Sequence, residues 1–196
     1  MPSRYLLPSL ILTLASFSLV AHEHGHEHEH EHEHEHEHSL AAHVHGVATL
    51  NIAIENQQLA LQLASPAMNI IGFEYKPHSA ADQHAVITAE RSLKNEQLLF
   101  VLPQSAGCSL SALDIDNDLT DLNHEEQHST DATQHQHSDI IVNYSYKCTN
   151  PTKLRSMELT GFFKAFPLTE KINVQLISAQ AQQGSELTAN NPLLSW

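Results

Sequence analysis

The chain has 196 residues, with 23 Asp or Glu against 9 Lys or Arg, so its formal charge at pH 7 is −14 when histidine is neutral. Nucleic acids and anionic membranes both require a basic surface, so this charge excludes them as partners and favours cations. The other unusual feature is histidine, which occurs 17 times.

Residues 1–21 have the features of a secretory signal peptide. One basic residue, Arg4, precedes an apolar run of about 15 residues that ends at Ala21, a small residue suited to cleavage. The run is shorter than the roughly 20 residues of a membrane-spanning helix, and it contains Pro8. We therefore expect a protein that is exported to the periplasm and is not inserted in the membrane after signal cleavage.

Residues 22–39 form a tract in which histidine alternates with glutamate. Neutral imidazole binds Zn²⁺, Ni²⁺ and Cu²⁺, and most histidines are neutral at pH 7. The alternative explanations are a purification tag or a low-complexity expansion without a selected role. We expect a disordered metal-binding tract whose ligands are His22, His24, His26, His28, His30, His32, His34, His36 and His38.

His43-Val44-His45 follows the tract and immediately precedes the first predicted strand. On an extended backbone, residues two apart point to the same face, with Cβ atoms about 6–7 Å apart, which is close enough to chelate one ion. We expect His43 and His45 to be ordered metal ligands; the alternative is two exposed polar residues at a strand end. Glu74, His78 and His84 are further candidates if the loop after the first hairpin folds back.

Residues 40–196 are expected to form one globular α+β domain. Its hydrophobic periodicity predicts, in chain order, strands at 48–54 and 59–63, a helix at 79–99, strands at 108–116 and 139–148, a helix or broken helix at 151–166, and strands at 171–179 and after Gly184. This ββα-ββα-ββ order predicts one or more antiparallel sheets built from three strand pairs, with two helical segments packed on them.

Two cysteines, Cys108 and Cys148, bracket the second predicted strand pair. In an oxidising compartment they most simply form one disulfide, and two buried thiols are the alternative. Between these strands lies a polar loop at 117–138, much longer than the two to five residues of an ordinary hairpin loop. We expect it to be disordered and to bind metal through His124, His128, His135 and His137.

Two patterns in this loop resemble known sites but lack the required context. The segment from His124 to His128 matches H-E-x-x-H, which in zinc hydrolases needs a helix with an apolar face, whereas this segment is polar throughout. The acids from Asp114 to Glu125 approach the spacing of an EF-hand, but Leu119 occupies the glycine position. We therefore expect no enzyme and no EF-hand, with a zinc-dependent hydrolase as a distant alternative.

Several segments together resemble the ZrgA family over essentially the whole mature chain. They are Ala42-His43-Val44-His45-Gly46, Ser65-Pro66-Ala67, Asn69-Ile70-Ile71-Gly72-Phe73-Glu74, Gly107-Cys108, Tyr146-Lys147-Cys148-Thr149-Asn150-Pro151, Phe163-Lys164-Ala165-Phe166-Pro167 and Asn191-Pro192. The resemblance implies a periplasmic Zn²⁺-binding accessory protein that works under zinc limitation with the substrate-binding protein or permease of an ABC-type zinc importer. Buffering or sequestration of excess Cu²⁺ or Ni²⁺ is the alternative, because histidine alone does not choose among these ions.

Overall fold

The computed structural model describes residues 44–120 and 138–196. The predicted signal peptide, the His/Glu tract, His43 and most of the predicted loop lie outside the described residues. The elements are β1 (Val47–Glu55), β2 (Gln58–Pro66), α1 (Ala67–Ile70), α2 (Ala80–Leu93), α3 (Glu96–Leu99), β3 (Cys108–Asn117), β4 (Asp139–Cys148), β5 (Ser156–Glu158), α4 (Thr160–Ala165), β6 (Lys171–Ser178), β7 (Gln182–Thr188) and β8 (Leu193–Ser195), with 3₁₀ turns at Gln104–Ala106 and Pro151–Lys153.

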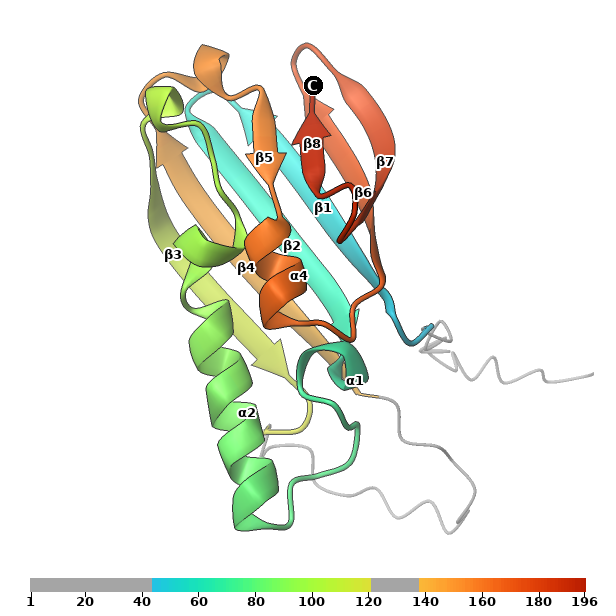
Figure 1. The fold of residues 1–196 in the computed structure, drawn as a ribbon. Coiled ribbons are helices and arrows are strands. Elements are labelled where there is room, and N and C mark those ends of the chain that lie inside the picture. Colours follow the sequence, from blue (N-terminus) through green and yellow to red (C-terminus); the bar gives the residue numbers. More distant parts are fainter. Residues whose placement is uncertain (1–43, 121–137) are drawn as a thin grey trace, which may run out of the picture. The chain divides into compact units, whose positions relative to one another are not determined.

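The described residues form a single α+β domain that is mostly sheet, as predicted (Figure 1). The three predicted strand pairs are present, and each is antiparallel: β1 with β2, β3 with β4, and β6 with β7. The prediction that the sheet is antiparallel throughout was wrong. All six strands join in one sheet of order β3-β4-β2-β1-β6-β7, and β1 pairs with β6 in parallel.

The physical reason for this error is that alternation of apolar residues assigns the two faces of a strand but not its neighbours. Leu50 and Ile52 of β1 lie opposite Val174 and Leu176 of β6, and all four side chains face the core. This pairing depends on a parallel contact between strands more than a hundred residues apart, which leaves no local signal.

The predicted helices are also shorter than expected. The helix predicted at 79–99 is divided into α2 and α3 around Lys94 and Asn95. The segment predicted as a helix or broken helix at 151–166 contains a 3₁₀ turn, strand β5 and the short helix α4. Met157 is therefore in a strand, because Ser156–Glu158 pairs with β8 near the end of the chain.

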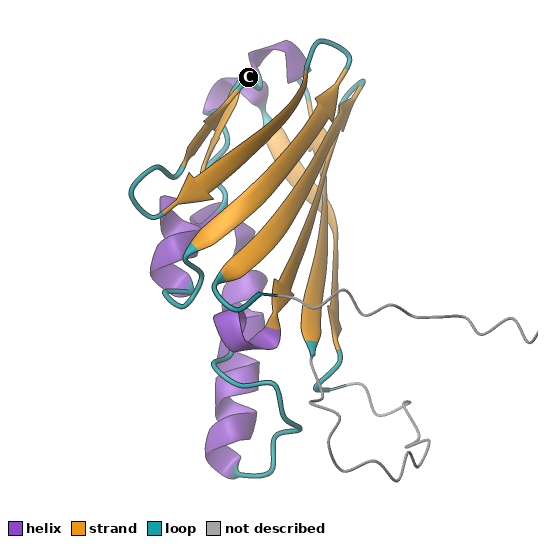
Figure 2. Ribbon diagram, turned by 90° about the vertical axis from the view of Figure 1, so that its right-hand side faces the viewer, coloured by secondary structure: helices purple, strands orange, loops and turns teal. Residues whose placement is uncertain are grey.

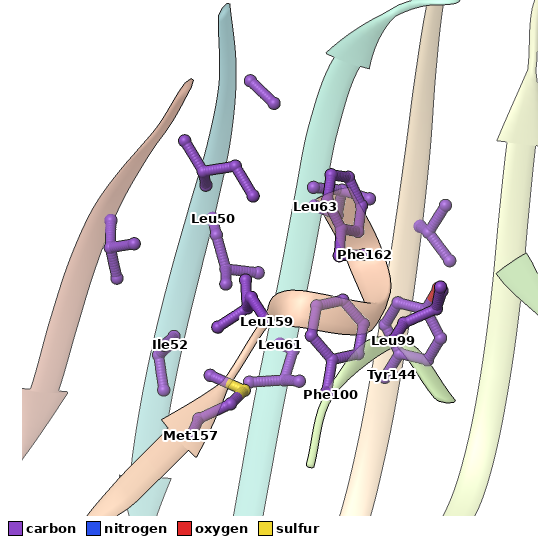
Figure 3. Packing of buried hydrophobic residues seen from close by; sticks show 14 of the residues in the cluster. Leu50, Ile52, Leu61, Leu63, Leu99, Phe100, Tyr144, Met157, Leu159 and Phe162 are labelled. Atoms are coloured by element: carbon purple, nitrogen blue, oxygen red, sulfur yellow. The ribbon is translucent and has the colours of Figure 1, made fainter. Parts of the chain in front are cut away.

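Helices and the small β5–β8 sheet cover one face of the six-stranded sheet, and no described helix or strand covers the other face (Figures 1 and 2). The core therefore lies between the large sheet and this layer. Figure 3 shows Leu50, Leu61 and Tyr144 on the sheet facing Phe100 and Phe162 from the covering segments. Among the described residues, no helix is both long enough and apolar enough to span a membrane.

Candidate metal site before the first strand

The chain enters β1 through a tight turn that contains His45. The backbone N–H of Val47 donates to the carbonyl of Val44 at 3.0 Å, and Gly46 has a φ of +83°. This φ favours glycine, and a Cβ there would also lie 3.0 Å from the carboxyl carbon of Glu170. The sequence-based premise of an extended backbone is therefore wrong at His45, because Gly46 turns the chain at that point.

Asn69 holds this turn against the end of the first hairpin. Its Oδ1 accepts from the backbone N–H of Gly46 at 2.7 Å, and its Nδ2 donates to the carbonyl of Val47 at 3.2 Å and to Oγ of Ser65 at 3.1 Å. The Asn69 side chain is buried, and its amide satisfies backbone groups that would otherwise lose their hydration. The backbone that directly follows His45 is thus held by the fold.

Among the described residues, Glu74 contacts His45. Nε2 of His45 lies 3.0 Å from Oε1 of Glu74, with side-chain exposures of 51% and 12%. The loop after the first hairpin and α1 folds back and brings this carboxylate to the turn, which was the condition under which Glu74 was a candidate ligand. Glu74 also contacts the far side of the long loop, because Oγ of Ser138 donates to its backbone carbonyl at 3.3 Å.

The sheet brings the attachment points of both histidine-rich segments to one end of the domain (Figure 1). Pro66, at the end of β2, pairs with Asp139 at the start of β4, and Asn117 at the end of β3 pairs with Ile140. Since β1 is antiparallel to β2, β1 begins at this same end. Val44, which follows His43, and Ser138, which follows His137, are therefore both at the end of the sheet where Glu74 lies.

Most of the predicted ligands lie outside the described residues. These are His22, His24, His26, His28, His30, His32, His34, His36, His38, His43, His124, His128, His135 and His137. Within 44–120 and 138–196, no three His, Cys, Asp or Glu residues form a group that could hold a metal ion. The described part of the chain thus supplies a His–Glu pair rather than a complete coordination sphere.

His78 and His84, the other histidines considered for this site, have different surroundings. The ring of His78 stacks on Tyr75 at 6.3 Å between centroids, and its backbone N–H donates to Asp82 at 3.2 Å near the start of α2. His84 lies on α2, with Nδ1 3.5 Å from Oγ1 of Thr88. Of the three candidates named with His45, the structure brings Glu74 to it and gives the two histidines local partners.

The acids that approach an EF-hand spacing are arranged differently from a calcium loop. Asp114 and Asp116 belong to strand β3, where they pair with Asn143 and Ile141. Asp118 Oδ2 accepts from the backbone N–H of Asp139 at 3.3 Å, which links the two ends of the long loop. A strand precedes this segment where an EF-hand has a helix, as the sequence analysis expected. The H-E-x-x-H segment is outside the described residues.

The predicted disulfide is confirmed. Cys108 and Cys148 are bonded, with a sequence separation of 40 residues, and they pair at the start of β3 and the end of β4. This places the bridge at the opposite end of the β3–β4 pair from Ser138. The bond therefore closes the strand pair from which the long histidine-rich loop extends.

Sequence reasoning missed the residues that support the turn. Asn69 lies among apolar residues, between Met68 and Ile70, and a buried amide in such a context signals a structural hydrogen-bonding role. Glu170 and Lys171 donate their backbone N–H groups to the carbonyl of Gly46 at 2.8 and 3.0 Å. No local sequence pattern predicts that contact, because it depends on the parallel pairing of β1 and β6.

Comparison with known proteins agrees with these observations. A model of a family described as "ZrgA family zinc uptake protein" matches residues 42–196, which is well over half of the chain. The match begins at the residue before His43 and includes the turn, Glu74, both cysteines and the long loop. The search of curated proteins gave no match. The extent of the family match establishes that this chain belongs to the ZrgA family of zinc uptake proteins.

Proposed function

We propose that this protein is exported to the periplasm, collects Zn²⁺ there, and assists delivery of the ion to an ABC-type zinc importer under zinc limitation. Family membership supports the link to zinc uptake. The apolar segment at 1–21 and the disulfide between Cys108 and Cys148 support export to an oxidising compartment. The partner in this proposal is the substrate-binding protein or the permease of the importer.

The observation that carries this proposal is that the described residues adjoining the two histidine-rich segments lie at one end of the sheet. The tract leads to His45, the long loop returns at Ser138, and Glu74 contacts both residues. Many weak ligand sets joined to one region raise the local concentration of an ion there, because an ion that leaves one set is recaptured by the next. A protein built in this way gathers zinc toward a defined place on its surface.

We propose no catalytic role for the chain. The matching family is one of zinc uptake proteins rather than enzymes. The H-E-x-x-H segment lies in a polar stretch of the sequence, without the apolar helical face that such a zinc site requires. We treat zinc as the cargo of the protein.

Zinc titration of two forms of the protein tests the collecting role. The mature chain from residue 22 is compared with a chain that lacks 22–38, each with the disulfide intact. We expect the shortened protein to bind fewer zinc ions and to keep some zinc through the long loop and the domain. Equal stoichiometry in the two forms would contradict the proposal that the tract collects zinc.

Delivery is tested by mixing the zinc-loaded protein with the zinc-free substrate-binding protein of an ABC-type zinc importer. Direct delivery predicts that the rate of zinc transfer rises with the concentration of the acceptor. A rate limited by spontaneous release of zinc would contradict delivery. Competition among Zn²⁺, Cu²⁺ and Ni²⁺, together with production of the protein under metal starvation or metal excess, separates zinc supply from buffering of excess metal.

A further inference from the structure

We propose that His45 and Glu74 both ligate zinc in an ordered site, in which the ion sits between Nε2 of His45 and Oε1 of Glu74. This deepens the proposed function and rests on it for the choice of metal. The sequence gives a long series of candidate ligands, and the structure selects these two because their donor atoms are 3.0 Å apart on a fixed part of the domain.

The spacing of the two donor atoms suits a zinc ion. Zinc binds imidazole nitrogen and carboxylate oxygen at about 2.1 Å, so two ligand atoms of a tetrahedral site lie roughly 3.4 Å apart. The observed separation of Nε2 and Oε1 is 3.0 Å. A shift of about 0.4 Å between the side chains therefore admits the ion.

The backbone on both sides of the pair is already held in place. Asn69 bonds to the backbone N–H of Gly46 and to the carbonyl of Val47, which fixes the turn that carries His45. On the other side, Ser138 donates to the backbone carbonyl of Glu74. Ligands that are positioned before the metal arrives bind it without a large ordering cost, which distinguishes this pair from histidines spread along a tract.

The exposures of the two side chains leave the site open on one side. The Glu74 side chain is 12% exposed, so its carboxylate interacts with a cation in a partly desolvated setting, where electrostatic attraction is stronger than in water. The His45 side chain is 51% exposed. An ion therefore reaches the pair from the solvent-exposed side of His45 and leaves by the same side.

The alternative role for the same contact is structural: an ordinary hydrogen bond that ties the loop carrying Glu74 to the turn. In that role, substitution of Glu74 alters the stability of the domain and leaves zinc binding at His45 unchanged. A site-resolved measurement of zinc binding therefore separates the two roles.

Protection of histidine from diethyl pyrocarbonate supplies that measurement on the full mature chain. The reagent acylates an unprotonated ring nitrogen, and coordination to zinc suppresses this reaction. Cleavage after Leu40 separates His45 from the tract, so mass spectrometry follows each segment independently. We expect zinc to protect His45 and the tract, and to leave the exposed His78 and His84 reactive as internal references.

Glu74→Gln, which keeps the size of the side chain, is the principal variant. We expect the zinc concentration for half-protection of His45 to rise at least tenfold, about the loss that follows when even an outer-shell partner of a metal ligand is removed. Protection of the tract should be unchanged. The matched control is Glu170→Gln, because the Glu170 carboxylate lies beside Gly46 and its loss removes the same charge from the same turn. For this control, we expect the zinc concentration for half-protection of His45 to change by less than about threefold.

Glu74→His distinguishes a ligand from a hydrogen-bonded charge, because it replaces one zinc ligand by another and removes the negative charge. A ligand role predicts protection of His45 within about threefold of the natural chain. The proposal is overturned if Glu74→Gln has no effect, if Glu170→Gln has the same effect, or if Glu74→His is as impaired as Glu74→Gln while thermal unfolding in EDTA shows both variants folded. If zinc does not protect the tract histidines of the natural chain, the collecting function is contradicted, rather than the site at His45 and Glu74.

Discussion

Replacement of Asn69 by alanine should destabilise the domain more than replacement of any exposed amide on the sheet. Asn69 is buried and makes three hydrogen bonds, of 2.7, 3.2 and 3.1 Å, to Gly46, Val47 and Ser65. Each such bond contributes about 1 kcal/mol net, so the loss is about 3 kcal/mol. For a domain of this size, that corresponds to a decrease in Tm of roughly 6–12 °C.

Thermal unfolding followed by circular dichroism, in EDTA and with the disulfide intact, measures this effect without a contribution from zinc. Asn51→Ala is the control, because Asn51 is exposed on the open face and donates a single bond of 3.3 Å to Gln62. We expect the control to change stability by less than about 0.5 kcal/mol. A loss below about 1 kcal/mol for Asn69→Ala would refute the argument that this amide holds the turn.

Three other perturbations have expected outcomes. Reduction of the Cys108–Cys148 bond should destabilise the domain by about 4 kcal/mol on the chain-entropy model, and urea unfolding with and without reductant measures it. Burial raises the pKa of both Tyr144 and Tyr146 above the value for an unfolded chain, so the folded state holds their protons more tightly. The contribution of these tyrosines to the free energy of unfolding is then fully present below about pH 10 and falls as pH rises further. Denaturant unfolding between about pH 8 and 12 tests this, and a free energy of unfolding that does not change with pH would contradict it. Zinc should leave residues 22–38 on acidification, because their charge changes from −7 with neutral histidine to +2 with all nine histidines protonated; constant zinc occupancy of this peptide between about pH 7.5 and 5.5 would contradict that expectation.

The strand pairs of this fold were predictable because their signals are local. Alternation such as Leu59, Leu61 and Leu63 assigns one face to the core, and the polar turn at 55–58 connects that strand to its partner. The parallel contact of β1 with β6 and the pairing of β5 with β8 were not predictable in this way. They join segments that are distant in the chain, and periodicity contains no information about which distant strand lies alongside.

The candidate site was predictable in its residue types but not in its geometry. The H-x-H pattern selected His45, and folding back of the loop was the stated condition for a role of Glu74, a condition that the 3.0 Å contact meets. The turn at Gly46 and the role of Asn69 were missed. The positive φ of the glycine and the hydrogen bonds of the buried amide both depend on residues distant in the chain, so a local sequence pattern does not predict them.

The proposed zinc binding has two kinds of step. A ligand that must be ordered on binding costs about 1–2 kcal/mol for each backbone residue that becomes fixed, whereas His45 and Glu74 are held by the folded domain before an ion arrives. In the proposed function, the many histidines of the sequence provide capacity, and the His45–Glu74 pair provides a defined position at which an ion is presented. In the proposed function, an acceptor protein binds the ion at the solvent-exposed side of His45 before the pair releases it, so transfer does not require free zinc as an intermediate.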